Sequence, residues 1–304
     1  MLPHLRRFYP PRFGRYIEPF LGSGAVFFDL KATGRLRGHD TILIDSNADL
    51  IGCYETVRDR PEAVVSALDA LAVAHKAIGR THYYHVRDRQ FNPARERLRQ
   101  SDGRIAYTPE LAAMFVYLNR TGFNGLFRLN ARGAFNVPAG RYARPKICDR
   151  ERLFRVADAL ADPRVSLRHG SFDETREVAA PDDFLYIDPP YAPVSRTANF
   201  TSYTPDRFGA DDQRRLHATV VSLVQRGCHV LLSNSTAAEI TGLYASDRET
   251  NRAGLTAIRI PARRAINCRG AGRGPVDEYL ITNIQASGPG VRAPLPTNGT
   301  SVLG

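Results

Sequence analysis

The chain has 304 residues, a formal net charge of +11 and an isoelectric point near 9.8. Its length allows one large domain or one domain with an insertion, and its positive charge favours a polyanionic partner. Its four cysteines are far apart and form no Cys-x-x-Cys pair, which argues against a zinc site or a disulfide framework. Residues 1–13 contain no apolar core of signal-peptide length and no later run approaches a membrane span, so we expect a cytoplasmic protein that does not use a membrane. We also expect no metal, in line with the cysteine spacing.

A strand, a glycine turn and a helix form the first structural unit. Residues 16–17 predict the strand, Glu18-Pro-Phe-Leu-Gly-Ser-Gly24 the turn, and the residues up to about Leu30 an amphipathic helix. Glycines at such a turn let the backbone approach a ligand closely. Because many turns and dinucleotide-binding folds share Phe-x-Gly-x-Gly, this motif alone is a weak signal.

The next predicted strand, residues 41–44, ends at Asp45, which follows Gly24 by 21 residues. At this spacing a carboxylate accepts hydrogen bonds from the ribose hydroxyls of a bound nucleoside. The pair predicts a nucleoside cofactor without choosing between a nicotinamide dinucleotide and S-adenosylmethionine. Asp45-Ser-Asn also suits the N-terminal cap of the following helix, and the two roles are compatible.

Residues 56–145 interrupt the alternation of strands and helices. Helical patterns replace it, including segments at 81–98 and 109–118, and this stretch carries +8 of the chain's net charge. Residues 111–148 contain no acidic residue, and the turn pairs Asn124-Gly125 and Arg132-Gly133 predict a hairpin. Interleaved basic, aromatic and amide side chains suit a nucleic-acid surface, where they bind phosphates, read base edges and wedge between bases. A solvated loop that is merely basic is the alternative.

The alternation returns with predicted strands at residues 165–167 and 184–187. The second of these, Phe184-Leu-Tyr-Ile187, is apolar throughout and ends abruptly in Asp188-Pro-Pro-Tyr191. In an open α/β sheet this carboxyl edge is where ligands bind, and the two prolines fix the turn and donate no hydrogen bonds. A carboxylate, bare carbonyls and an aromatic face together suit a planar group that carries an amine. The alternative is an ordinary turn whose aspartate caps a neighbouring group.

Beyond this turn, residues 195–203 lack periodicity and predict a loop over the site. A helix at 211–226 and strands at 230–232, 255–260 and 278–282 follow. Residues 252–273 carry six arginines and no acid, which suits either a second phosphate-facing loop or a basic hairpin. Residues 286–304 are rich in Gly, Pro, Ser and Thr and are predicted to be disordered.

Taken together, these motifs resemble those of the Dam-type DNA adenine methyltransferases. The resemblance covers residues 2–284 and is specific because many motifs occur in the same order. They are Glu18-Pro-Phe-Leu-Gly-Ser-Gly24, Asp45, Asn119-Arg-Thr-Gly-Phe-Asn-Gly-Leu-Phe-Arg128, Phe135-Asn-Val-Pro-Ala-Gly-Arg-Tyr142, Asp188-Pro-Pro-Tyr191, Ser195-Arg-Thr-Ala-Asn-Phe-Thr-Ser-Tyr203, Leu232-Ser-Asn234 and Val276-Asp-Glu-Tyr-Leu280.

The resemblance implies an α/β fold, with a Rossmann-like methyltransferase sheet and an inserted, mainly helical DNA-recognition domain that carries a hairpin. Residues 1–55 and 146–285 would form the catalytic domain and residues 56–145 the insertion. The implied activity is site-specific transfer of a methyl group from S-adenosylmethionine to the 6-amino group of a flipped adenine in double-stranded DNA, the EC 2.1.1.72 class. GATC is a target typical of the family, and we expect a nucleoid-associated monomer.

The resemblance also implies roles for individual residues. The target adenine would be held by Asp188, Pro189, Pro190 and Tyr191. The cofactor would contact Glu18, Phe20, Gly22, Ser23, Gly24, Asp45, Phe172 and Asp188. The DNA would contact Phe123 as the inserted ring, Asn124, Leu126 and Arg128 at base edges, Tyr142, and the backbone-binding residues Arg87, Arg120, Asn130, Asn136, Arg141 and Ser195.

One expected motif is missing from the front of the chain. Family members carry a Lys-Trp-x-Gly-Gly-Lys segment upstream of the short helix that residues 2–8 resemble, and this chain has no tryptophan. Because the later motifs are intact, we expect the true start to lie upstream. The alternatives are a DNA-binding protein with impaired or no catalysis, and a methyltransferase acting on RNA or on a protein amide. The basic insertion disfavours the protein substrate.

Overall fold

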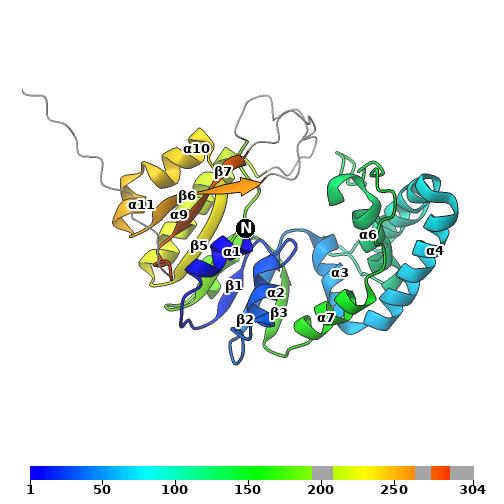
Figure 1. Cartoon of the computed structure of the whole chain (residues 1–304), viewed down its shortest axis with the longest axis horizontal. Coiled ribbons are helices and arrows are strands. Elements are labelled where there is room, and N and C mark those ends of the chain that lie inside the picture. Colours follow the sequence, from blue (N-terminus) through cyan, green and yellow to red (C-terminus); the bar gives the residue numbers. More distant parts are fainter. Residues whose placement is uncertain (194–207, 264–274, 288–304) are drawn as a thin grey trace, which may run out of the picture.

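The computed structural model describes residues 1–193, 208–263 and 275–287. These form a lobe built on a seven-stranded sheet and a helical lobe beside it (Figure 1). The strand order is β3-β2-β1-β4-β5-β7-β6. The strands are β1 Tyr16–Glu18, β2 Thr41–Asp45, β3 Val165–His169, β4 Phe184–Ile187, β5 His229–Ser235, β6 Thr256–Arg263 and β7 Pro275–Thr282.

The direction and order of the strands define where a ligand can bind. β1 to β5 pair in parallel, whereas β7 is antiparallel to both β5 and β6. The order of the parallel strands reverses at β1 and β4, which lie side by side in the middle of the sheet. A crevice forms outside the carboxyl ends of strands at such a switch point. The predicted Rossmann-like α/β class is confirmed.

Both faces of the central sheet are buried, which explains the continuous apolar sequence of β4. Leu185 and Ile187 pack in one core against α9, Ala210–Gln225. Phe184 and Tyr186 point to the opposite core, which includes residues of α1, Leu2–Leu5, and α2, Ala25–Ala32. The short helices α8 Thr175–Val178, α10 Ala238–Ile240 and α11 Arg248–Arg252 complete this lobe.

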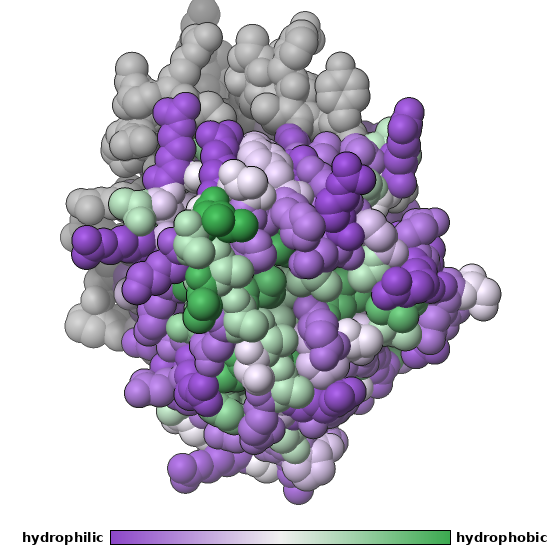
Figure 2. Space-filling view, turned by 90° about the vertical axis from the view of Figure 1, so that its right-hand side faces the viewer, coloured by the Kyte–Doolittle hydropathy of each residue, from purple (hydrophilic) through white to green (hydrophobic). Residues whose placement is uncertain are grey.

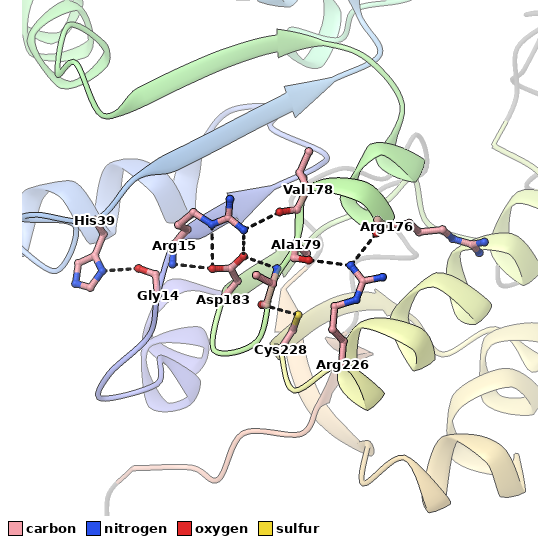
Figure 3. A network of polar contacts seen from close by, with 10 residues as sticks. Gly14, Arg15, His39, Arg176, Val178, Ala179, Asp183, Arg226 and Cys228 are labelled. Atoms are coloured by element: carbon pink, nitrogen blue, oxygen red, sulfur yellow. Dashed lines mark hydrogen bonds and ion pairs between the residues drawn. The ribbon is translucent and has the colours of Figure 1, made fainter.

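The amino edge of the sheet is held together by a network around Asp183 (Figure 3). This buried carboxylate lies just before β4 and accepts hydrogen bonds from the backbone N–H of Arg15 at 2.9 Å, its Nη2 at 2.7 Å and the N–H of Ala180 at 2.8 Å. Nearby, Arg226 donates to the carbonyls of Arg176 and Ala179. These contacts hold the start of β4 next to the start of β1 and near the turn before β5. They therefore fix the register of these strands, and with it the position of their carboxyl ends at the opposite edge of the sheet.

The helical lobe has a hydrophobic core of its own. Its helices are α3 Ala48–Asp59, α4 Pro61–His85, α5 Asn92–Arg97, α6 Pro109–Thr121 and α7 Arg150–Leu160, with a π-helical turn at Val86–Phe91. The core includes Val64, Tyr83 and Tyr117, and it also includes Cys53 and Ala157, which lie outside residues 56–145. The boundaries of the insertion therefore stay a prediction. The inserted segment is mainly helical, as predicted, and it contains an antiparallel bridge between Leu129 and Phe135.

The outer face of the helical lobe is mixed in character. Figure 2 shows hydrophobic residues gathered among hydrophilic ones on this face. α4 is the outermost helix here, and it carries the exposed side chains Val73 and Ile78. α4 is also kinked at Gly79, whose φ of 52° lies in the left-handed region.

Candidate functional site

A cleft of about 870 Å³ lies at the carboxyl ends of β1 to β4. The cleft lies at the switch point of the sheet, where the strand order reverses and where open α/β sheets bind their ligands. The predicted glycine turn, Asp45 and the Asp188 turn all reach it. Its lining residues are Pro19, Phe20, Gly22, Asp45, Ser46, Gly170, Ser171, Phe172, Asp188, Pro189, Pro190, Tyr191, Phe208, Asp212 and Arg215.

Backbone conformation explains the glycines of the turn after β1. Gly22 and Gly24 have φ values of 48° and 62°, which side chains other than glycine rarely adopt. A Cβ on Gly24 would also lie 2.9 Å from the ring of Phe28. Asp45 accepts a hydrogen bond from the N–H of Gly22 at 2.9 Å, and from that of Asn47 at the same distance. The turn and the end of β2 are thus fixed relative to each other.

Burial raises the pKa of two carboxyl groups near the glycine turn, those of Asp45 and Glu18. Burial raises the pKa of Asp45, while the two backbone N–H groups oppose this change. Glu18 is fully buried beneath the turn, and burial raises its pKa to about 8. It accepts from the hydroxyl of Tyr16 at 2.7 Å and from the N–H of Phe27 at 3.2 Å. Glu18 therefore stabilises the glycine turn through these buried hydrogen bonds. Of the predicted cofactor contacts, three do not line the cleft, namely Glu18, Ser23 and Gly24.

An aromatic group forms one wall of the cleft. Phe20 and Phe172 stack with ring centroids 5.4 Å apart, and Phe208 packs edge-on against both. The guanidinium of Arg215, on α9, lies 5.1 Å from the centroid of Phe172 and pairs with Asp212 at 2.9 Å. Sequence reasoning missed Phe208 and Arg215, because no local motif marks a ring before a helix or an arginine on its second turn.

The turn after β4 presents Asp188 and Tyr191. Asp188 is open to the cleft on one side and surrounded by protein on the others, and this desolvation raises its pKa. The hydroxyl of Ser233 on β5 donates to Asp188 Oδ1 at 2.6 Å, which lowers the same pKa. The hydroxyl of Tyr191 donates to Glu278 Oε2 on β7 at 3.3 Å. The predicted carboxylate and aromatic face therefore share one pocket with the glycine turn and Asp45.

The helical lobe carries a second, basic hollow of about 710 Å³. Four of its side chains are cationic and exposed, and amides and a tyrosine lie between them. Three of the large apolar side chains that the described residues expose lie in the same part of the chain, namely Phe123, Leu126 and Tyr142, each 38 to 48% exposed. The hollow is lined by Asn119, Arg120, Asn124, Gly125, Arg141, Tyr142, Ala143, Arg144, Pro145 and Lys146.

The predicted hairpin lies next to this hollow. Leu129 and Phe135 pair antiparallel, and the side chain of Asn130 accepts from the N–H groups of Arg132 and Ala134 inside the turn. Asn130 thus shapes the turn. Across the hairpin, Nε of Arg128 donates to Oδ1 of Asn136 at 2.8 Å.

Two side chains of α5 hold the base of the hairpin. Asn92 exchanges two hydrogen bonds with the backbone of Phe135, at 2.8 and 3.0 Å. Arg95 donates to the carbonyl of Gly133 at 2.8 Å and forms a two-point ion pair with Asp49, both distances 2.6 Å. Asp49 lies in the first turn of α3, which is capped by Asn47, two residues after Asp45. The hairpin is therefore linked through the buried Arg95–Asp49 pair to the start of α3, which follows β2.

Arg87, a predicted contact with the DNA backbone, has partners within the protein. Arg87 donates to Asp88 at 2.7 Å and to the carbonyl of Val137 at 3.0 Å, and it packs over the ring of Tyr84. Arg87 thus supports the chain that follows the hairpin, and its predicted contact with the DNA backbone stays a prediction. Ser195 lies outside the described residues.

Among the described helices, none combines the length and apolar character needed to cross a membrane. Within the same residues, no three His, Cys, Asp or Glu side chains are grouped as metal ligands would be.

The family model for D12 class N6 adenine-specific DNA methyltransferases matches residues 1–259. The chain belongs to this family. It is 34% identical over 287 residues to the Type II methyltransferase M1.LlaDCHI of Lactococcus lactis subsp. cremoris, covering 93% of this chain and 91% of that protein. It is 36% identical over 275 residues to the Type II methyltransferase M.MjaIII of Methanocaldococcus jannaschii, covering 88% of each.

A third relative, the DNA adenine methylase of Escherichia coli, is 34% identical over 264 residues, which are 87% of this chain and 84% of that enzyme. The family resemblance that the motifs indicated is therefore confirmed. The predicted activity, adenine-specific DNA methylation, is confirmed with it. The family assignment also removes the alternative of a methyltransferase that acts on RNA or on a protein amide. Whether the missing N-terminal motif impairs catalysis is a question for the activity measurement below.

Proposed function

We propose that this methyltransferase binds S-adenosylmethionine between the Gly22 turn, Asp45 and Phe172, and receives a flipped adenine in the pocket formed by Asp188 and Tyr191. The observation that carries the proposal is that one cleft holds both groups of residues. A methyl donor and its acceptor must meet at a single point, and the switch point of the sheet provides it. We further propose that the enzyme acts in the cytoplasm, as a monomer, on GATC.

The residues present fit the cofactor. Asp45 lies in the cleft and carries a raised pKa from burial, so partners that donate hydrogen bonds, such as two ribose hydroxyls, would stabilise its ionised form. The backbone of Gly22 is uncovered, and the stacked rings of Phe20 and Phe172 offer an apolar wall for a planar base. When bound, S-adenosylmethionine supplies a methyl group already activated by a sulfonium.

The residues of the Asp188 turn would prepare the amine. The lone pair of the adenine amine is delocalised into the ring, so the amine is a poor nucleophile. Hydrogen bonds from its two N–H groups to Asp188 and to the carbonyl of Pro189 would localise this pair and direct it toward the methyl carbon. Stacking on Tyr191 would hold the ring plane. The N–C bond would form as the C–S bond of the sulfonium breaks, and one amine proton would pass to the Asp188 carboxylate and on to solvent. Positioning and electrostatics are then sufficient, with no covalent bond to the protein.

The helical lobe would hold the DNA. Arg120 and Arg141 project from the basic hollow and suit phosphates, while Arg128 and Asn124 suit base edges. Extruding a base costs a few kcal/mol. The exposed ring of Phe123, inserted in its place, would offset part of this cost.

The test uses purified protein in two steps. First, titration with S-adenosylmethionine measures cofactor binding directly. Second, transfer of labelled methyl groups to duplex DNA is compared between the wild type, Asp188→Ala and the surface control Asp211→Ala. We expect binding of the cofactor, activity in the wild type and control, and no activity in Asp188→Ala with DNA affinity retained. Full activity in Asp188→Ala would refute the assignment of the site.

A further inference from the structure

The last residues of β5 contact the turn that follows β4. The Ser233 hydroxyl donates to Asp188 Oδ1 at 2.6 Å, and the hydroxyl of Ser235 donates to the carbonyl of Ala192 at 2.7 Å. Both serine side chains are buried, although the Asp188 carboxylate itself is open to the cleft. The two bonds hold the turn at its first residue, Asp188, and just beyond its last, Tyr191.

A relay from β5 through α9 holds the middle of the same turn. Asn234 donates through Nδ2 to Oε1 of Gln213 at 3.1 Å, and Gln213 donates through Nε2 to the carbonyl of Pro190 at 3.0 Å. Both amides are fully buried. Because Asn234 occupies the oxygen of Gln213, the NH₂ group of Gln213 is oriented toward Pro190. The carbonyl of Pro190 is therefore already an acceptor within the protein.

The carbonyl of Pro189 differs from its neighbour. Within residues 1–193, 208–263 and 275–287, no N–H or O–H group donates to it. Asp188 and Pro189 both line the cleft. A planar amine has two N–H groups in one plane about 120° apart, so it needs two acceptors at fixed relative positions.

Resting on the proposed function, we infer that Ser233 and Gln213 are positioning residues that select the two oxygens receiving the target amine. Ser233 engages Oδ1 of Asp188 and leaves Oδ2 for one amine hydrogen. Gln213 engages the carbonyl of Pro190 and leaves that of Pro189 for the other. Without these two restraints the turn would offer four acceptor oxygens and several amine orientations, few of which aim the nitrogen at the methyl carbon.

The expected kinetic signature follows from this role. Misplacement of a reacting group by about 1 Å lowers the rate on the order of 100-fold without removing the groups that bind the ligands. Gln213→Met removes the donor while keeping a side chain of similar length, and Ser233→Ala removes one hydroxyl. In each variant we expect kcat to fall about 10- to 100-fold. We expect KM for the cofactor and for DNA to stay within about threefold, since the contacts that bind both ligands remain.

Matched controls separate positioning from general damage. Gln225→Met changes an exposed glutamine at the end of the same helix, α9, and should keep the wild-type kcat. Ser233→Thr keeps a hydroxyl and should recover most of the activity lost in Ser233→Ala. Base flipping, measured by the fluorescence of 2-aminopurine at the target position, should be unchanged in both test variants because the wedge and the DNA contacts are intact.

The outcomes are distinguishable. A kcat within twofold of the wild type in Ser233→Ala or Gln213→Met overturns the inference, and so does a rise in KM as large as the fall in kcat. Thermal melts followed by circular dichroism report the fold, and Ser233→Ala decides the matter should Gln213→Met fail to fold. Full activity in Asp188→Ala would instead overturn the proposed function. An inactive Asp188→Ala beside two fully active test variants would leave that function standing and remove this inference alone.

Discussion

The turn after β4 and the hairpin at residues 128–136 are proposed to bind different parts of the same substrate, and they are built differently. The turn is held at its start, middle and end by buried side chains of β5 and α9. The hairpin is held at Phe135 by the half-buried Asn92 and at Gly133 by the buried Arg95, whereas Arg132 at its tip is exposed. Methyl transfer requires each hydrogen-bond acceptor of the turn to stay in one position. Binding of DNA instead requires side chains that are free to move at the tip of a hairpin whose backbone is fixed.

The first way to break this comparison is to remove the buried support of the hairpin. Arg95→Ala leaves Asp49 buried without its cation, so we expect the free energy of unfolding to fall by about 3 to 5 kcal/mol. Arg58→Ala breaks a pair with Asp59 that is partly exposed, and should cost about 0 to 1 kcal/mol. Urea unfolding measures both. Equal losses would show that the buried pair is no more important than the surface one.

The buried Glu18 below the glycine turn should make the free energy of unfolding depend on pH. The pKa of Glu18 is about 8 in the folded protein, against 4.5 unfolded. The folded state therefore binds a proton more tightly, so this contribution to stability is full below pH 4.5 and is lost as the pH rises through about 8. We expect a loss of a few kcal/mol, since a tenfold change in proton affinity corresponds to about 1.4 kcal/mol.

Glu18→Gln isolates this contribution because the amide keeps the shape and does not titrate. Urea unfolding at pH 5.5 and pH 8, without cofactor, should show a smaller loss of stability in the variant than in the wild type. An unchanged dependence on pH would mean that another group is responsible.

The third prediction sharpens the division between base reading and phosphate binding. Arg128→Ala should lose about 1 to 3 kcal/mol of binding free energy and relax discrimination at one base pair. Arg120→Ala, in the basic hollow, should weaken binding to all sequences and reduce the salt dependence by about one phosphate contact. Competition binding with single-base variants of the target measures both. A uniform loss in Arg128→Ala would make this residue a phosphate contact.

The smallest effect on stability is expected at the tip of the recognition surface. Phe123 is 38% exposed, so Phe123→Ala should change the free energy of unfolding by only about 1 kcal/mol. It should nevertheless reduce the fluorescence gain of 2-aminopurine at the target, because the extruded base loses its replacement in the stack. Wild-type fluorescence in this variant would exclude the wedge.

Sequence reasoning was most successful where the signal is local. β4 is apolar because both faces are buried, and its prolines mark its end, so strand and pocket position could both be predicted. The two glycines with positive φ and the cap at Asn47 are also local signals. The alternation of such units is typical of an α/β protein, and the family resemblance implied the Rossmann-like class.

Contacts between distant segments could not be predicted in this way. Gln213 meets Pro190, and Arg95 meets Asp49, only through tertiary packing of residues 23 and 46 positions apart. No motif marks Phe208 or Arg215 in the cleft. Arg87 has a basic side chain suited to DNA, but the structure gives it partners within the protein. α7 was not anticipated as a separate helix, although Leu153, Val156 and Leu160 recur at helical spacing in its sequence.

Methylation sequencing of DNA from cells that express the wild type or Asp188→Ala tests the central claim most directly. The account predicts N6-methyladenine at one short target sequence in the wild type and none in the variant, although the variant still binds DNA. Methylated adenine at the same sites in Asp188→Ala would contradict the account, because the methyl group would then be transferred without the carboxylate that holds the amine.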